Sequence, residues 1–250
     1  MKAVIRLDQA LVARGLCASR EQAQRAILAG QVLRNGQVAR KASEPVRPED
    51  ELALAAAARY VSRGGYKLEH ALRHFAVDVI GAVAVDLGAS TGGFTDCLLQ
   101  QGAARVFAVD VGQGQLAWKL RRDPRVVVME RTNARRLTPA QMPAPFAGAN
   151  IVTVDCSFIS LRLVLPAAVA LLRPSGKLLA LIKPQFEAGK QEAARGAGVI
   201  TDPAVHQRVL AEVEAFAGTL PGVRWRGVTA SPLWGPAGNR EFLALLEKVD

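Results

Sequence analysis

Short apolar runs alternate with amphipathic segments along most of the chain. From residue 61 onward, five apolar runs are typical of buried parallel strands, at 83–85, 106–109, 126–129, 151–154 and 178–182. Between them, apolar residues at helical spacing predict helices over 94–101, 115–121 and 161–172. This alternation predicts an open α/β sheet whose ligand site lies outside the carboxyl ends of the strands.

The first part of the chain has a different pattern. Apolar positions in 7–11 form a short helical stripe, and Ser19 followed by Gln22 has the spacing of a capping box for a second helix, which ends before Gly30. Asn35-Gly36 then favours a two-residue hairpin, and 51–54 is expected to return as a strand. Since the pattern changes near residue 59, we expect a small domain at 1–58, a linker at 59–61 and an α/β domain at 62–250.

Composition adds a charge asymmetry to this pattern. The chain carries 32 Lys and Arg against 22 Asp and Glu, a net charge of +10, while its apolar content of 50% is ordinary for a globular protein. Residues 1–47 hold nine basic and three acidic side chains, so +6 of the excess lies there. Positive potential attracts polyanions, which indicates a nucleic acid or, less specifically, an acidic membrane surface as partner.

Export and membrane insertion are not predicted. The N-terminal residues form no long apolar segment, and no stretch reaches the roughly 18 apolar residues that span a bilayer. Cys17, Cys97 and Cys156 form no CxxC pair and have no histidines at zinc spacing. We therefore expect a cytoplasmic protein with reduced thiols and no metal site, and we expect it to be a monomer.

A glycine-rich loop, VDLGASTGGF at 85–94, joins one predicted strand to the next helix. Its glycines allow a tight turn, and the helix N-terminus offers free N–H groups to an anion. A nucleoside triphosphate is disfavoured because GxxxxGK[ST] is absent, and a dinucleotide because G-x-G-x-x-G is not matched. S-adenosylmethionine is the third candidate. Asp110 after the next strand would suit its ribose, although a dinucleotide site also places an acid at about that distance.

The segment RLDQALVARG, followed by SREQAQRAILAGQVLRNGQV, resembles the S4 RNA-binding domain over nearly its whole length. In that family two helices and the following hairpin present a basic face to structured RNA. The resemblance implies that Arg6, Ser19, Arg20 and Arg25 contact RNA phosphates. The alternative for any single arginine is a solvated position on a helix surface.

Six further motifs follow in order: VSRGGYKLEHAL, VDLGASTGGFTDCLL, AVDVGQGQLAWKLRRDPRVVVMERTNARRL, VDCSFISL, LIKPQFEAGK and SPLWGPAGNREF. With the S4-like segment they resemble the TlyA (haemolysin A) family of FtsJ-like ribosomal RNA methyltransferases over essentially the entire chain. The resemblance implies a Rossmann-like methyltransferase sheet with helices on both faces, preceded by a small α+β S4 domain. It also implies transfer of a methyl group from S-adenosyl-L-methionine to a ribose 2′-hydroxyl of ribosomal RNA in a ribosomal subunit.

The family uses a Lys-Asp-Lys-Glu tetrad, which the motifs place at Lys67, Asp155, Lys183 and Glu241. A ribose hydroxyl is a poor nucleophile, so its attack on the methyl group requires in-line placement and removal of the proton. We expect Lys183 to act as general base or to steer the hydroxyl, both carboxylates to orient its ammonium, and Lys67 to position the nucleotide. Taken singly, Asp155 has the alternative of a helix N-cap and Lys67 that of a solvated helix lysine.

For the cofactor, the resemblance implies contacts of the glycine-rich loop with the methionine moiety, of Asp110 with the ribose and of Asn133 with the region near the adenine. The loop residues are Gly88, Ser90, Thr91, Gly92 and Gly93. Asp155 is expected close to the methyl donor, and no metal is required. Asn133 has the alternative role of a turn residue.

Two other functions remain open from the sequence. A non-catalytic RNA-binding factor for ribosome assembly would carry the same basic residues but would be expected to have lost part of the tetrad. A membrane-lytic haemolysin would need an exposed apolar segment, and the longest candidate, 164–172, falls where a helix covering the sheet is expected.

The sequence also predicts three finer features. Phe158 and Phe186 are predicted to pack, with a nucleotide shelf as the alternative. Arginines between 121 and 136 form a second basic concentration that would extend the RNA track. The chain resembles the shorter branch of the family, which is associated with a cytidine of the large ribosomal subunit.

Overall fold

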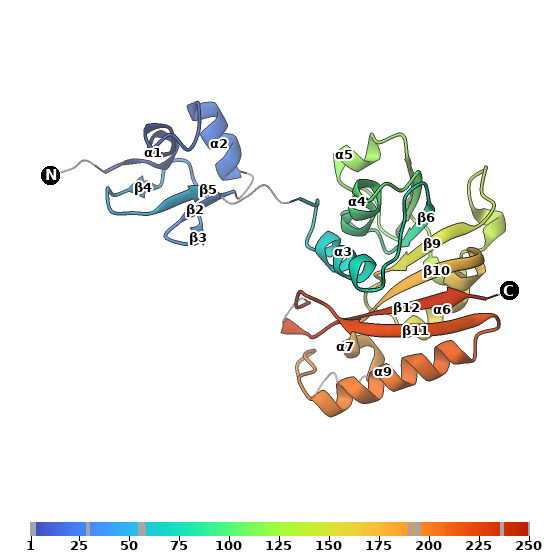
Figure 1. The fold of residues 1–250 in the computed structure, drawn as a ribbon. Coiled ribbons are helices and arrows are strands. Elements are labelled where there is room, and N and C mark those ends of the chain that lie inside the picture. The colour runs from blue at the N-terminus through green and yellow to red at the C-terminus, as the bar shows by residue number, and fades with distance from the viewer. Residues whose placement is uncertain are drawn as a thin grey trace. The chain divides into compact units, whose positions relative to one another are not determined.

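The computed structural model describes residues 4–28, 31–54, 59–189, 192, 196–235 and 238–249. The chain divides into two compact units, Met1–Arg59 and Tyr60–Asp250 (Figure 1). In the expected linker, Tyr60 is only 2% exposed and belongs to a hydrophobic cluster of the larger unit. The neighbouring Val61 N–H donates to Asp96 Oδ2 at 2.8 Å, so these two residues are tied to the larger unit.

The smaller unit is built from two helices and short antiparallel strands. The strands are β1 (Ile5–Arg6), β2 (Val32–Arg34), β3 (Gln37–Val38), β4 (Pro45–Val46) and β5 (Leu52–Leu54), with β1 paired to β4 and β2 between β3 and β5. The helices are α1 (Leu7–Ala13) and α2 (Arg20–Leu28). Their apolar faces form the core of this unit together with Val32 of β2.

Local sequence signals account for the turns of this unit. Gln22 N–H donates to Ser19 Oγ at 3.2 Å, which is the capping bond predicted for α2. The side chain of Gln22 accepts from the N–H of Ala18 at 2.8 Å, one residue before the expected partner. Asn35 and Gly36 both have positive φ, 50° and 77°, as a two-residue hairpin with twist-matched strands requires.

The larger unit is built on a seven-stranded sheet in the order β11-β12-β10-β9-β6-β7-β8. The five parallel strands are β6 (Val83–Leu87), β7 (Arg105–Val109), β8 (Val126–Met129), β9 (Ala149–Val154) and β10 (Leu172–Ile182). Antiparallel β12 (Phe242–Lys248) and β11 (Val223–Ala230) extend the sheet beyond β10. The strand order reverses between β6 and β9, which is where open α/β sheets bind their ligands.

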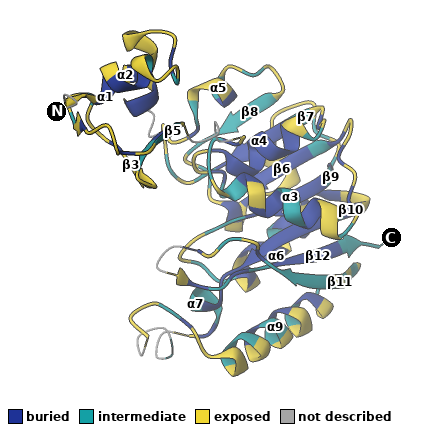
Figure 2. Cartoon of the chain, turned by 60° about the vertical axis from the view of Figure 1, so that its left-hand side comes forward, coloured by how far each residue is buried: buried dark blue, intermediate teal, exposed yellow. Residues whose placement is uncertain are grey.

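Helices cover both faces of this sheet, as predicted (Figure 2). One face packs against α3 (Gly64–His74), α4 (Gly93–Gln100) and α5 (Trp118–Arg121), and the other against α6 (Leu161–Ala170) and α9 (Pro203–Gly218). Alternate residues of β10 divide between the two cores, since Leu179 and Leu181 join the first and Leu178 and Ile182 the second. The remaining short elements are α7 (Pro184–Glu187), η1 (Ala134–Arg136) and η2 (Pro139–Gln141).

One predicted helix agrees with the structure, and another is shorter than predicted. The apolar run at 164–172 does fall largely within α6, whose buried face packs on the sheet. Helix α5 is shorter than the predicted 115–121 because the preceding residues bond to the glycine-rich loop: Ala117 is extended, and its N–H donates to Thr91 O at 3.1 Å. Among the described residues, no helix combines the length and the apolar character needed to cross a membrane.

Candidate active site

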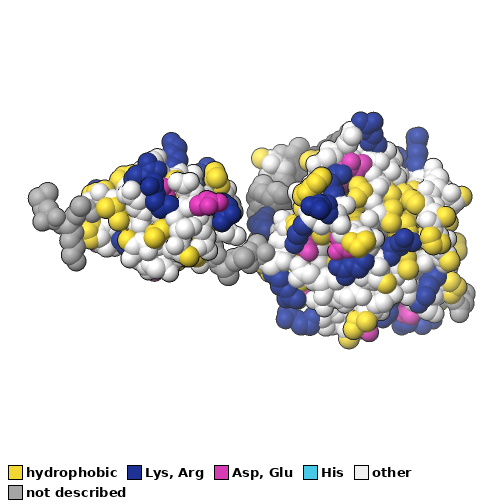
Figure 3. Space-filling view, turned by 90° about the horizontal axis from the view of Figure 1, so that it is seen from above, with side chains coloured by type: hydrophobic (Ala, Val, Ile, Leu, Met, Phe, Trp, Pro, Cys, Tyr) yellow, Lys and Arg dark blue, Asp and Glu magenta, His cyan; other side chains and the backbone are white. Residues whose placement is uncertain are grey.

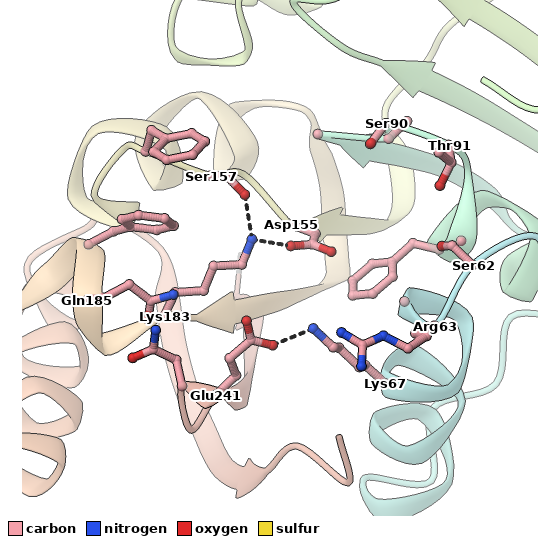
Figure 4. Close-up of a pocket in the computed structure, with 18 of the residues that line it drawn as sticks. Ser62, Arg63, Lys67, Ser90, Thr91, Asp155, Ser157, Lys183, Gln185 and Glu241 are labelled. Carbon is pink, nitrogen blue, oxygen red and sulfur yellow. Dashed lines mark hydrogen bonds and ion pairs between the residues drawn. The ribbon is translucent and has the colours of Figure 1, made fainter. Parts of the chain in front are cut away.

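A cavity of about 880 Å³ lies at the carboxyl ends of β6, β9 and β10 (Figure 4). Its walls are the glycine-rich loop, the segments after β9 and β10, the first turn of α3, residues 197–198 and the segment before β12. All four residues of the predicted tetrad line it. Five of the six motifs therefore contribute residues to one site.

The glycine-rich loop passes close to the strand that carries Asp155. Gly88 has a φ of +86°, and a Cβ there would lie 2.6 Å from the carbonyl oxygen of Asp155, so only glycine fits. Asp110 holds the far side of the loop, since its carboxylate accepts from the N–H groups of Ser90 at 2.8 Å and Gly112 at 2.7 Å. The loop is thus fixed between β7 and β9 before any ligand binds.

The expected cofactor residues do not all face the cavity. Gly88, Ser90, Thr91 and Gly93 line it, together with Asp155. Gly92, Asp110 and Asn133 are absent from its lining. A Cβ on Gly92 would lie 2.2 Å from Leu120, so this glycine serves the packing of α5 on the loop. Asn133 caps η1 by accepting from Arg135 N–H at 3.0 Å, which is the turn role given as its alternative.

Lys183 follows β10 and is held by three acceptors from the segment after β9. Its Nζ lies 2.6 Å from Asp155 Oδ1 and donates to Ser157 Oγ at 2.9 Å and to Cys156 O at 3.2 Å. The lysine side chain is 9% exposed and that of Asp155 24%. Asp155 is not a helix N-cap, because α6 begins at Leu161 with Ser160 in that position.

Lys67 and Glu241 form a second pair across the cavity. Lys67 lies on α3 and Glu241 directly before β12, and their side chains make an ion pair in the interior. Lys67 is 7% exposed and Glu241 is fully buried, so the alternative of a solvated helix lysine is wrong. Burial of a single charge is costly, and each charge here has an opposite partner.

The pairing differs from the expected one. We expected both carboxylates to orient Lys183. In the structure, Asp155 forms an ion pair with Lys183, and Glu241 forms one with Lys67 (Figure 4). Motif spacing could not reveal this, because the partner of Glu241 comes from α3 on a distant part of the chain. One carboxylate per amine neutralises each buried charge locally.

Two buried acceptor atoms of the cavity wall lack partners. Glu241 Oε1 and Gln185 Oε1 have no hydrogen-bond partner within the part of the chain that the structure describes. An unsatisfied buried acceptor costs about 1–3 kcal/mol, which a donor in the cavity would recover. The site is therefore arranged to receive a ligand with hydroxyl or amino groups.

Asp86 lies beneath the loop, fully buried in β6. Its carboxylate accepts from Thr95 Oγ1 at 2.7 Å and Thr153 Oγ1 at 2.9 Å, which links α4, β6 and β9. Burial raises the pKa of Asp86 to about 6, partly offset by the two hydroxyl bonds. The motif containing Asp86 was recognised, but periodicity alone did not single out this acid.

We expect the substitution Asp86→Asn to flatten the pH dependence of stability. Between pH 4 and 6 the native state holds a proton at Asp86 that the unfolded chain, with the ordinary aspartate pKa of about 4, has lost, so this carboxyl's contribution falls as pH rises. Two pKa units correspond to about 2.7 kcal/mol in all, of which about 2 kcal/mol falls between pH 4.5 and pH 7.5. Urea unfolding at pH 4.5 and pH 7.5 measures it. An equal change in the free energy of unfolding for wild type and variant would contradict the prediction.

Several lining residues were not predicted, and three of them, Ser157, Gln185 and Asn239, share a spacing with the tetrad. Ser157 and Gln185 each follow a tetrad residue by two positions, in VDCSF and LIKPQF, and Asn239 precedes Glu241 by two. A search for polar residues two positions from each tetrad residue would have predicted all three. Asn239 Nδ2 donates to Gly198 O at 2.9 Å and its Oδ1 accepts from Ile200 N–H at 3.0 Å, so it anchors one wall.

Two aromatic rings stand at the cavity edge. Phe158 is 90% exposed, has a φ of +63°, and its ring centroid lies 5.2 Å from that of Phe186. The packing expected for Phe158 is therefore wrong. Both rings line the cavity, which favours the alternative of a shelf for a nucleotide.

In the smaller unit, two of the expected RNA contacts surround one buried acid. Asp8 is inaccessible to solvent, and its carboxylate accepts from Arg6 Nε and Arg20 Nη2, each at 3.0 Å. The Arg6 guanidinium holds the pKa of Asp8 well below its usual range. Arg25 pairs with Glu21 at 3.5 Å on the exposed face of α2. Figure 3 shows Lys and Arg side chains together on the visible face of this unit.

The sheet order, the glycine loop after β6 and the lysine–carboxylate pairs at the carboxyl edge define the larger unit as a Rossmann-like methyltransferase. The family model for FtsJ-like methyltransferases matches residues 60–248, and that for the S4 domain matches residues 5–52. The chain belongs to the FtsJ-like methyltransferases, and within them to the TlyA (haemolysin A) family.

Relatives resemble the chain over nearly its full length. A Bacillus subtilis protein named putative rRNA methyltransferase YqxC is 49% identical over 95% of this chain and 84% of its own. The Mycobacterium tuberculosis protein named 16S/23S rRNA (cytidine-2′-O)-methyltransferase TlyA is 47% identical over 96% of this chain and 89% of its own. A solved structure described as a putative hemolysin from Streptococcus thermophilus is 44% identical, with a TM-score of 0.75, and covers 100% of this chain and 90% of that one.

Proposed function

We propose that the protein transfers a methyl group from S-adenosyl-L-methionine to the ribose 2′-hydroxyl of a cytidine in ribosomal RNA. The observation that carries this proposal is the pair of buried ion pairs, Lys183 with Asp155 and Lys67 with Glu241, on one side of the glycine-rich loop. The name of the M. tuberculosis relative supports the nucleotide and the RNA class. The intact tetrad argues against a non-catalytic assembly factor.

The loop fits the methionine part of the cofactor. Gly88 lets the loop pass directly against the backbone of Asp155, where a Cβ would not fit, and the N-terminus of α4, whose first residue Gly93 lines the cavity, suits a carboxylate. Gly88, Ser90, Thr91 and Gly93 would hold this part, and Asp110 would accept from the ribose hydroxyls. Asn133 stays a prediction for the adenine. When bound, S-adenosylmethionine supplies an electrophilic methyl group on its sulfonium sulfur.

The two ion pairs would position the attacking hydroxyl. Of the three acceptors on Lys183 Nζ, Cys156 O is the farthest at 3.2 Å, and it is the one that a ribose oxygen would replace. Lys183 would thereby hold the attacking oxygen towards the methyl group that the cofactor supplies, and the Lys183–Asp155 pair would take up the hydroxyl proton. Glu241 Oε1, which lacks a partner among the described atoms, would accept from a neighbouring hydroxyl of the nucleotide.

The smaller unit would bind structured RNA. Arg6 and Arg20 share the buried carboxylate of Asp8, so their side chains are held while still 47% and 55% exposed. A guanidinium that is already oriented loses less rotamer freedom when it contacts a phosphate. Arg6, Ser19, Arg20 and Arg25 remain the proposed contacts, with the RNA of a ribosomal subunit as partner.

Methyl transfer from labelled cofactor to separated 30S and 50S particles tests the proposal. We expect incorporation at a cytidine, and preference for the 50S particle follows from the family branch that the sequence resembles. Alkaline hydrolysis distinguishes ribose from base methylation, because a 2′-O-methyl group blocks cleavage at its phosphodiester. Label confined to a base, or absent from both particles and from free rRNA, would refute the activity.

A further inference from the structure

A second hollow lies on the other side of one wall of the active-site cavity. It has a volume of about 300 Å³ and is lined by Ile200, Thr201 and Pro203, by His206 and Gln207 of α9, and by Trp234, Arg240 and Phe242. None of these residues lines the active-site cavity. The proposed function makes no use of this hollow.

The wall between the two spaces is short and well bonded. Asn239 joins it to residues 198–200 by the two hydrogen bonds described above. Asn239 and Glu241 line the active-site cavity, whereas Arg240 and Phe242 line the hollow. Successive residues from 239 to 242 line the two spaces alternately, so the hollow adjoins the segment that carries Glu241.

The side chains of the hollow are of the kinds that bind unpaired bases. Trp234 is 56% exposed, and the guanidinium carbon of Arg240 lies 5.0 Å from its ring centroid. Within the described residues Arg240 makes no ion pair, so its charge is available to an anion. His206 packs edge-on against Phe242 at 5.6 Å, and its Nε2 contacts Ile200 O at 2.9 Å. Aromatic and guanidinium planes stack on bases of any identity, and a free positive charge attracts the phosphate.

We propose that this hollow receives an unpaired base of the RNA substrate, from a nucleotide that neighbours the methylated one in the strand. The base stacks on the exposed part of the Trp234 indole, and Arg240 contacts the adjoining phosphate. The inference rests on the proposed function for its substrate. A peptide is disfavoured because the hollow combines the Arg240 cation with aromatic rings on a chain of net charge +10.

Two measurements on the full chain test this base site. In steady-state methyl transfer to 50S particles, we expect Trp234→Ala to raise KM for the particle about 10-fold, with kcat and cofactor affinity within 2-fold, because stacking contributes to RNA binding alone. Trp234→Phe keeps a ring and should stay within about 3-fold of wild type. Ile80→Ala is the matched control, since Ile80 is 77% exposed and lies before the amino end of β6, whereas the site lies at the carboxyl ends of the parallel strands.

The second measurement does not depend on catalysis. Titration with a fluorescently labelled single-stranded oligoribonucleotide gives binding by anisotropy and, in an unlabelled parallel, quenching of tryptophan fluorescence. We expect quenching in wild type and in Trp118→Phe, and its loss in Trp234→Phe. RNA that binds without quenching Trp234, or an unchanged KM in Trp234→Ala, would overturn the base site. Quenching without methyl transfer to any RNA would instead refute the proposed function and leave the base site standing.

Discussion

Replacing Lys183 with alanine is expected to reduce methyl transfer by about 10²–10⁴-fold while leaving cofactor affinity within about 3-fold of wild type. The substitution removes the only amine bonded to Asp155, Ser157 and Cys156 within the described residues, and with it the group that would hold the attacking oxygen. None of these three partners belongs to the glycine-rich loop, so the loop should keep its conformation and its affinity for the cofactor. Cofactor binding is measured by calorimetry and methyl transfer with labelled donor on 50S particles.

Lys177→Ala is the matched control. Lys177 lies on the same strand, β10, paired with Ile151 near the start of β9, away from the carboxyl edge. It should retain wild-type rate and affinity. Wild-type incorporation by Lys183→Ala would contradict the role proposed for this lysine. Loss of cofactor binding together with activity would show that the ammonium serves the cofactor site rather than the hydroxyl.

Gly88→Ala is expected to lower both methyl transfer and cofactor affinity by at least about 100-fold. The new Cβ would lie 2.6 Å from the carbonyl oxygen of Asp155, and the φ of +86° is unfavourable for alanine. To avoid this overlap, either the glycine-rich loop or the segment that carries Asp155 must move. A shift of about 1 Å in such a site is enough for losses of about 10²-fold.

Gly81→Ala is the control that distinguishes the effect of backbone strain from the effect of atomic overlap at Gly88. Gly81 also has a positive φ, +68°, but a Cβ there would meet no atom within 4 Å. We expect a loss of stability of about 1 kcal/mol and no change in cofactor affinity. Thermal unfolding and calorimetry on both variants provide the comparison. Equal cofactor affinity for Gly88→Ala and wild type would show that the loop does not cradle the cofactor.

The parallel strands could be predicted because β6, β7, β9 and β10 are mostly buried on both faces, and because these four and the half-buried edge strand β8 appear in the sequence as largely apolar runs. All five predicted runs lie within β6 to β10. Helix boundaries were harder to predict where a tertiary contact competes with helix formation. At α5 the bond from Ala117 to the glycine-rich loop holds three predicted helical residues in another conformation.

The composition of the site was predictable for a different reason. Residues that follow parallel strands meet at one edge of the sheet, so Gly88, Asp155 and Lys183 had to approach each other once the strands were recognised. Their pairing was not predictable, because Lys67 and Glu241 reach the cavity from α3 and from the approach to an antiparallel strand. The exposure of Phe158 was also missed, since an aromatic residue in an apolar motif usually packs.

By itself, the sequence determined the two-part organisation, the α/β class of the larger unit, the loop between β6 and α4 and the residue types gathered at its edge. These follow from short-range periodicity and from turn chemistry, which act within a few residues. Only the tertiary structure decided which amine pairs with which carboxylate, which expected cofactor residues face the cavity, and that a second hollow adjoins it behind Asn239. Each of these depends on contacts between segments far apart in the chain, and local patterns carry no information about their geometry.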